Sequence, residues 1–265
     1  MRMIDPHLHI DSRSVEDLQS MAIAGIAAVV SQVYYPHYNV QITPQTYFDY
    51  YDRHIHYEPA RTKDEQIETF LGIGINMVDV PHDWEKVVET LPHYLKEERV
   101  VCFGEIGLEP TSQTGDLATQ EEILKAQLEV ARQHHVPVVF HTPLHEKEKW
   151  IEKYARFIEA AKIEKQKVLI DHATPAVVKQ IWEMGCHAGI TVQPWRNVFP
   201  IDAATVVVAG ENLNRLFIDS DSSPKISDAL AVPKAAYEMR KLGVKEKDIQ
   251  QVVFENPKKF YNLSL

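Results

Sequence analysis

The sequence is poor in cysteine, and it contains no long hydrophobic run. Only two cysteines, Cys102 and Cys186, occur among 265 residues. Both fall in apolar segments, so we expect buried free thiols rather than a disulfide. The longest stretch without Asp, Glu, Lys or Arg, residues 20–48, is interrupted by glycine, proline and polar residues, and its apolar part is too short to cross a bilayer. An aspartate already stands at position 5, which argues against a signal peptide. We therefore expect a cytoplasmic protein without a membrane partner.

The chain also lacks a net positive charge. The chain carries 28 Lys and Arg residues against 38 Asp and Glu residues, a formal net charge of −10 at pH 7. This balance gives no electrostatic footprint for nucleic acid or anionic lipid. We therefore expect a small-molecule substrate rather than nucleic acid. No linker, repeat or low-complexity block divides the chain, so we expect one domain over residues 1–265.

Eight apolar, strand-like segments alternate with helical segments along the chain. They cover residues 1–9, 26–33, 70–76, 100–105, 137–141, 168–172, 186–192 and 216–221. This alternation predicts an α/β fold of the (β/α)8 TIM barrel type. In such a barrel the carboxyl ends of the parallel strands meet on one face, and binding sites lie there.

Helix boundaries are also indicated by capping residues. Ser14, followed by Asp17 three residues later, predicts the start of a helix that Gly25 ends. Thr119 and Glu122 have the spacing of a capping box, which predicts a helix over residues 120–133.

The segment 34–65 is crowded with aromatic side chains, eight of the 24 in the chain. Helical spacing of Tyr47, Tyr50, Tyr51 and Ile55 after a Thr-Pro start predicts a helix. The segment has two interpretations: it packs on the body of the protein, or it forms a lid or one wall of a substrate pocket.

Five of the predicted strands end on side chains that bind metal ions. His7 and His9 point to the same side of an extended strand, because the side-chain period of a strand is two. The candidate metal ligands are His7, His9, Glu105, His141, His172 and Asp221. So many titratable groups in one ring are costly without a cation. We expect two divalent ions bridged by Glu105, with zinc favoured and manganese, iron, nickel or magnesium as alternatives.

The motifs resemble those of the TatD-type metal-dependent hydrolases of the amidohydrolase superfamily, over essentially the whole chain. Residues 5–9 match the D-x-H-x-H opening, and residues 104–108 match G-E-x-G-L after the fourth strand. Residues 219–224 are similar to E-T-D-x-P with one residue more. Weaker matches occur at residues 120, 127–131, 137–141 and 256–260.

This resemblance implies a function and a division of the ligands. One ion would be held by His7, His9, Glu105 and Asp221. The other would be held by Glu105, His141 and His172. Asp221 would be the catalytic general base, acting on a water that the metals activate. The implied function is metal-dependent hydrolysis of an ester, phosphoester or amide bond.

Three departures from the family pattern concern the substrate. Pro143 stands where an arginine is usual, Asn76 replaces the histidine of G-x-H-P, and Glu109 replaces a common aspartate. The loss of basic and histidine positions weakens the case for a nuclease, as does the acidic net charge. Two alternatives therefore stay open: a lactonase or carboxyl-ester hydrolase of the same superfamily, and a metal-binding scaffold without turnover.

Two further sites in the sequence are candidates for binding the substrate or supporting a metal ligand. Trp195 and Arg196 follow the seventh strand, where Arg196 is suited to bind an anionic substrate group and Trp195 to stack on it; an exposed loop arginine is the alternative. Asp5 is placed either to orient a ligand histidine or to cap the strand end.

Overall fold

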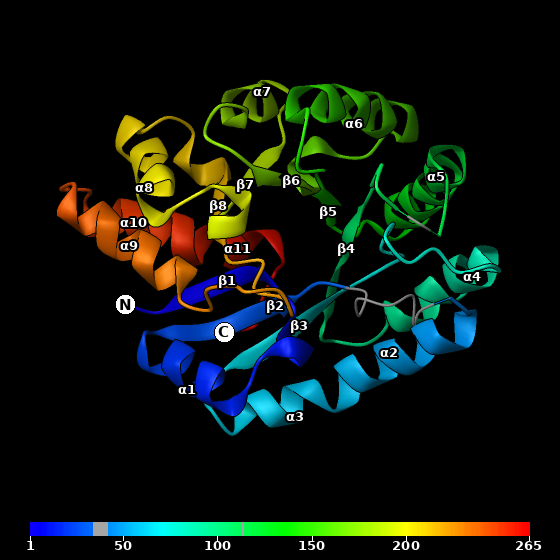
Figure 1. Cartoon of the computed structure of the whole chain (residues 1–265), viewed down its shortest axis with the longest axis horizontal. Helices are drawn as coiled ribbons and strands as arrows, with labels where there is room; N and C mark the ends of the chain where they lie inside the picture. Colours follow the sequence, from blue (N-terminus) through cyan, green and yellow to red (C-terminus); the bar gives the residue numbers. More distant parts are fainter. Residues whose placement is uncertain (34–41, 113) are drawn as a thin grey trace.

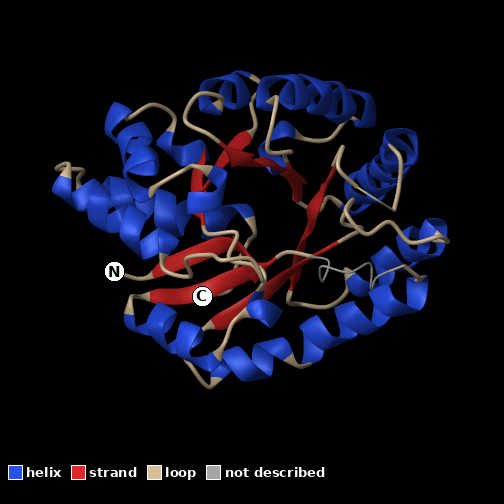
Figure 2. Ribbon diagram, viewed as in Figure 1, coloured by secondary structure: helices blue, strands red, loops and turns tan. Residues whose placement is uncertain are grey.

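Eight parallel strands form a barrel in which each strand pairs with its neighbours in sequence order, as predicted (Figures 1 and 2). This computed structural model describes residues 1–33, 42–112 and 114–265. The strands are β1 (Met3–Leu8), β2 (Ile26–Ser31), β3 (Glu68–Ile73), β4 (Val100–Gly107), β5 (Val138–His141), β6 (Val168–Ala173), β7 (His187–Thr191) and β8 (Leu216–Asp219).

Helices surround the barrel on its outer side (Figure 2). They are α1 (Val15–Ile23), α2 (Pro44–His56), α3 (Glu58–Lys63), α4 (Trp84–Tyr94), α5 (Leu117–His134), α6 (Lys147–Ala161), α7 (Val178–Glu183), α8 (Pro200–Ala209), α9 (Ala231–Lys241), α10 (Glu246–Gln250) and α11 (Asn256–Phe260). A π-helical segment, Gln251–Glu255, joins the last two.

The barrel closes between the end of β1 and the segment that follows β8. The Asp221 N–H donates to the His7 carbonyl and the His9 N–H to the Ser222 carbonyl, both at 2.9 Å. A parallel bridge joins Leu8 and Ser222. Closure therefore brings Asp221, from the far end of the chain, beside the two amino-terminal histidines.

Apolar side chains fill the barrel below these strand ends. Along β2, Ala28 and Val30 belong to this interior cluster, whereas Val29 packs in the larger cluster between strands and helices. The cluster also contains Phe254 and Tyr261 from the carboxyl-terminal segment. The polar residues at the strand ends therefore lie directly above a packed, apolar barrel interior.

Two of the expected helix starts are confirmed. The Ser14 hydroxyl accepts a hydrogen bond from the Asp17 N–H before α1, and Gly25 after α1 has a φ of 101°, which suits glycine. Thr43 caps α2 in a capping box with Thr46.

The expected capping box at Thr119 and Glu122 is wrong. The helix α5 begins three residues earlier than the 120–133 range, and the Asp116 carboxylate accepts from the Thr119 N–H at 2.8 Å. Asp116 thus accepts a hydrogen bond from a free N–H group at the start of the helix, the role that was expected of Thr119 one turn later. Asp116 is therefore the N-cap residue.

The aromatic segment packs on the body of the protein over residues 42–65. Tyr47 and Tyr51 on α2 are fully buried, and their hydroxyls donate to the carbonyls of Asp79 and Gly74, each at 2.7 Å. The aromatic positions 34, 35 and 38 lie outside the described residues, and the hypothesis of a lid there stays a prediction.

The two cysteines are buried and free, as expected. Among the described residues, no helix combines the length and apolar character needed to cross a membrane.

Candidate metal centre

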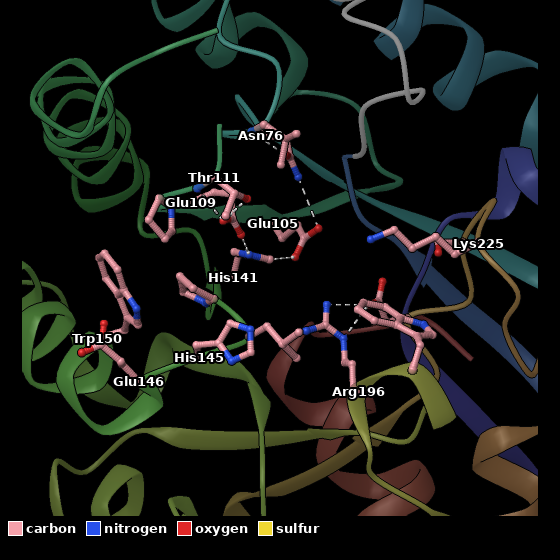
Figure 3. Close-up of a pocket in the computed structure, with 17 residues that line it drawn as sticks. Asn76, Glu105, Glu109, Thr111, His141, His145, Glu146, Trp150, Arg196 and Lys225 are labelled. Carbon is pink, nitrogen blue, oxygen red and sulfur yellow. Dashed lines mark hydrogen bonds and ion pairs between the residues drawn. The ribbon is translucent and has the colours of Figure 1, made fainter. Parts of the chain in front are cut away.

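A pocket of about 290 Å³ opens at the carboxyl ends of the strands (Figure 3). Its lining includes three of the six predicted ligands, Glu105, His141 and Asp221, together with Trp195 and Arg196. His7, His9 and His172 lie buried directly beneath, with exposed fractions of 1% or less. The structure therefore brings all six predicted ligands to one place.

Glu105 stands at the centre of this arrangement. Its Oε2 atom lies 3.0 Å from His141 Nδ1 and 2.9 Å from His172 Nε2. Its Oε1 atom faces the other way, 4.0 Å from His9 Nε2. One carboxylate thus presents an oxygen to each of two histidine groups, as a bridging ligand does.

His7, His9 and Asp221 complete the group on the first side. Asp221 Oδ1 lies 3.1 Å from His9 Nε2 and 3.9 Å from His7 Nε2. His7 Nε2 is also 3.9 Å from Glu105 Oε2. The ligand atoms of His7, His9 and Glu105 lie within 4.8 Å of one another, and so do those of Glu105, His141 and His172.

Each of the four histidines has its second ring nitrogen fixed by a different group. His9 Nδ1 donates to the Gln32 carbonyl at 3.1 Å, and His141 Nε2 donates to Glu109 Oε2 at 3.1 Å. His172 Nδ1 lies 2.8 Å from the Thr191 hydroxyl oxygen. This hydroxyl donates its own proton to Asp219 at 2.8 Å, so it accepts from His172.

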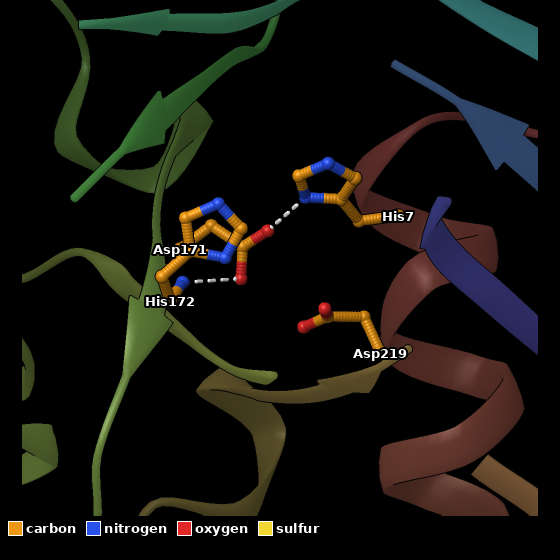
Figure 4. A group of neighbouring side chains, drawn as sticks. All are labelled: His7, Asp171, His172 and Asp219. Carbon is orange, nitrogen blue, oxygen red and sulfur yellow. Dashed lines mark hydrogen bonds and ion pairs between the residues drawn. The ribbon is translucent and has the colours of Figure 1, made fainter. Parts of the chain in front are cut away.

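Asp171 fixes the fourth histidine. Its carboxylate accepts from His7 Nδ1 and from the backbone N–H of His172, the latter at 2.8 Å (Figure 4). The side chains of His7, Asp171, His172 and Asp219 are all buried. Supporting groups of this kind orient the ring and choose its tautomer, so that the free nitrogen faces the metal.

The donor set fits divalent metal ions. His7 Nε2 is buried and has no hydrogen-bond partner among the described residues, although it faces Glu105 and Asp221. A buried polar atom without a partner is costly, and a cation would satisfy it. Imidazole and carboxylate ligands suit zinc and similar ions.

In the metal-free chain, protons on two of the histidines supply the positive charge that metal ions would bring. Burial opposes protonation of His7, but Glu105 and Asp171 outweigh it and raise its pKa to about 10. Burial likewise opposes protonation of His141, and Glu105 and Glu109 raise its pKa to about 9. The site therefore holds extra positive charge between its carboxylates, which is the charge that metal ions would supply.

Arg196 lies against Asp221. Its Nε and Nη2 atoms donate to Asp221 Oδ2 at 3.0 and 2.7 Å, which leaves Oδ1 facing the histidines. Burial opposes ionisation of Asp221, but Arg196 and His172 hold its pKa well below the ordinary value. The guanidinium also lies 4.2 Å from the ring centroid of Trp195.

Among the described residues, Asp5 forms no hydrogen bond with the side chain of a predicted ligand. Its Oδ1 accepts from the backbone N–H groups of Ser220 and His7, at 3.1 and 3.4 Å. Asp5, inside β1, thus joins this strand to the backbone after β8, and Asp171 rather than Asp5 orients His7.

A family model described as TatD related DNase matches residues 4–262. The chain belongs to this TatD family. It is 32% identical over 262 residues to an uncharacterised metal-dependent hydrolase of Methanocaldococcus jannaschii, covering 98% of this chain and all of that protein.

Two solved structures of TatD proteins share the fold. The TatD-like protein of Archaeoglobus fulgidus has a TM-score of 0.79 and 27% identity, covering 98% of this chain and all of that one. A TatD homologue of Escherichia coli has a TM-score of 0.70 and 18% identity, covering 99% and 98%. The chain is thus a TatD-family metal-dependent hydrolase with the barrel of these proteins.

The sequence did not reveal the roles of Glu109 and Asn76, although both depart from the TatD pattern. Glu109 fixes His141, and Asn76 Nδ2 donates to Glu105 Oε1 at 3.3 Å. Asn76, at the place where the family pattern has a histidine, therefore holds one oxygen of the Glu105 carboxylate. Asp171 was also missed, although it directly precedes the ligand His172.

Proposed function

We propose that this protein uses two divalent ions to hydrolyse an ester, phosphoester or amide bond of a small molecule. One observation carries the proposal: each of four histidines has one ring nitrogen fixed and the other turned toward Glu105 or Asp221. A single structural ion would need only four ligands in a closed shell, whereas six ligands line or underlie an open pocket here.

We assign the candidate ligands to two ions as the family resemblance implies. His7, His9, Glu105 and Asp221 would hold one ion, and Glu105, His141 and His172 the other. Ions bound there would polarise the oxygen of the scissile bond and lower the pKa of a coordinated water.

Asp221 is our candidate for the general base. It accepts the proton that the attacking water loses and passes it to the leaving group. Arg196 stabilises the ionised carboxylate through Oδ2, so the proton does not remain on Asp221. The same ion pair fixes the direction of Oδ1 toward the histidines.

The pocket supports a small molecule as the substrate. Its volume of about 290 Å³ is near the lower end of the range for small-molecule sites. Pro143, which stands where the family has an arginine, lines the pocket together with Leu144. An apolar wall at this place suits a lactone or carboxyl ester better than a nucleic-acid phosphate, and the net charge of −10 opposes a polyanion.

A substrate panel on metal-loaded protein without a histidine tag tests the proposal. The panel contains phosphoesters, lactones, carboxyl esters, amides and single- and double-stranded DNA. We expect turnover of at least one small-molecule class, loss of turnover with a chelator, and no rapid degradation of DNA. Turnover that survives complete metal removal would contradict a metal-dependent reaction.

Asp221→Asn tests the assignment of the base. We expect kcat to fall on the order of a hundredfold or more, because proton transfer contributes about this much. The fold and at least one ion should remain, as measured by circular dichroism and metal analysis. Asp64→Asn, an exposed change at the end of α3, is the matched control. Near-normal turnover in Asp221→Asn would exclude its role as the base.

A further inference from the structure

The pocket contains a lysine that forms no ion pair with a carboxylate of the described residues. Lys225 lines the pocket four residues after Asp221, and its ammonium group points toward Glu105 (Figure 3). Among the described residues, no carboxylate forms an ion pair with it, whereas Arg196 is engaged by Asp221. Of these two basic side chains, only Lys225 has a positive charge that is free to bind a ligand.

Trp195 holds Lys225 in place from one side. The Lys225 Nζ atom lies 4.5 Å from the centroid of the indole ring, over which Arg196 also lies. A cation over an indole ring is stabilised by the charge distribution of the ring. Because Asp221 neutralises Arg196, the positive charge left at this edge of the pocket is that of Lys225, and it attracts an anion.

The loop that carries Lys225 is fixed by hydrogen bonds. The Ser227 hydroxyl lies 3.0 Å from the Lys225 carbonyl oxygen and 2.9 Å from that of Ser223. Arg13, after β1, donates to the Ser223 carbonyl at 2.5 Å, and Gln193, after β7, accepts from the Asp228 N–H at 3.0 Å. The backbone at Lys225 is therefore held in place relative to Asp221 before any ligand binds, although the lysine side chain itself is exposed.

The opposite side of the pocket presents the indole ring of Trp150, with Glu146 beside it (Figure 3). Trp150 and Lys225 lie on opposite sides of Glu105 and His141 (Figure 3). Four other apolar residues, Val78, Pro110, Pro143 and Leu144, also line the pocket. Glu105 and His141 thus lie between the ammonium group of Lys225 and the indole ring of Trp150, which we call the Trp150 wall.

We propose that the substrate is a small amphiphilic anion: Lys225 binds its carboxylate or phosphoryl group, and the Trp150 wall receives its apolar group. The scissile bond then lies between the two, over Glu105 and His141. This inference rests on the proposed hydrolase function. It also moves the anion-binding role that the sequence suggested for Arg196 to Lys225, because Arg196 is already paired.

Binding of non-hydrolysable probes tests Lys225 without turnover. We would titrate zinc-loaded protein with 3-phenylpropionate, phenylphosphonate and the neutral 3-phenylpropionamide in a calorimeter. We expect at least one anion to bind at least tenfold more tightly than the amide, and the tighter anion identifies the headgroup. Lys225→Met should weaken the binding of that anion about ten- to a hundredfold, the usual range for a charged hydrogen bond.

Two further variants make the binding test specific. Lys225→Arg should retain most of the affinity, because it keeps the charge. Lys241→Met, which removes an exposed lysine on α9, should bind like the unchanged protein. If the anion binds equally to the unchanged protein and to Lys225→Met, it contacts the metal ions instead and the inference is wrong. Failure of both anions to outbind the amide would also refute it.

Hydrolysis of a matched ester pair separates this inference from the proposed function. The pair is 4-nitrophenyl hemisuccinate, an anion, and 4-nitrophenyl butyrate, its neutral counterpart. We expect the ratio of kcat/KM for the anion over the neutral ester to fall about tenfold in Lys225→Met. Hydrolysis of both esters with an unchanged ratio would leave the hydrolase function standing and refute the role of Lys225. Hydrolysis of neither would count against the ester substrates alone, and the calorimetric result would still decide on Lys225.

Discussion

Both walls of the candidate metal centre contain a histidine held by a carboxylate, but one pair is buried and the other is partly exposed. In the deep wall, His7 on β1 pairs with Asp171 on β6, and both side chains are completely buried. In the open wall, His141 on β5 pairs with Glu109, and these side chains are 17% and 14% exposed. In each case a carboxylate fixes one ring nitrogen and turns the other toward Glu105 or Asp221.

The two pairs differ in whether water can reach a group that has lost its partner. If the deep pair is broken, a charged group remains in a dry place with no replacement partner. If the open pair is broken, water from the pocket can reach the remaining group. The comparison therefore predicts that the deep wall is coupled to folding, whereas the open wall adjusts metal affinity with little effect on the fold.

The largest effect should come from Asp171→Asn. We expect the free energy of unfolding of the metal-free protein to fall by about 3 to 5 kcal/mol, the usual cost of breaking a buried ion pair. The ion held by His7 and His9 should also be lost. Urea denaturation at pH 7, followed by circular dichroism, measures the first effect, and metal analysis measures the second. Equal destabilisation by Asp171→Asn and Glu109→Gln would remove the distinction between the walls.

Glu109→Gln should have an intermediate effect. We expect the affinity for the ion held by His141 and His172 to fall about 10- to 100-fold, as for other groups that support a metal ligand. The loss of stability should be about 1 to 2 kcal/mol. Competition with a coloured chelator measures the affinity. Glu129→Gln, an exposed change on α5, is the control and should leave metal binding unaltered.

The smallest effect concerns the protons released when metal binds. With pKa values raised to about 10 and about 9, His7 and His141 carry protons at pH 7 that the ions must displace. Apparent metal affinity should therefore rise with pH and level off above about pH 10. Glu109→Gln should reduce the release by up to about one proton at pH 7, because His141 loses one of the carboxylates that raise its pKa.

Calorimetry in buffers with different ionisation enthalpies counts these protons. The difference between the unchanged protein and Glu109→Gln is the informative quantity. If metal binding to the unchanged protein released no protons at pH 7, the histidines would be neutral in the metal-free chain. That result would contradict the charge balance described for the site.

The sequence predicted the barrel and the gathering of the six candidate ligands, because both depend on position along single strands. An apolar segment that ends on His141 or His172 identifies a strand and its functional end at once. Barrel closure then follows from the number and order of the strands, and it brings Asp221 to His7 without any further information.

The supporting groups could not be predicted in the same way. Thr191 reaches His172 from the neighbouring strand, and Asp171 reaches His7 from a strand that does not pair with β1. Such contacts depend on strand register and side-chain direction, which a period-two pattern does not specify. The pairing of Arg196 with Asp221 was missed for the same reason. The cap of α5 was misplaced because Asp116 and Thr119 both satisfy the capping preferences.

Metal content tests the central claim most directly, namely that Glu105 bridges two ions. Protein without a histidine tag, saturated with zinc or manganese and freed of excess metal, should contain about two ions per chain. Glu105→Gln should contain about one and keep its circular dichroism spectrum, since a neutral amide bridges poorly. At most one tightly held ion in the fully loaded, unchanged protein would contradict the account.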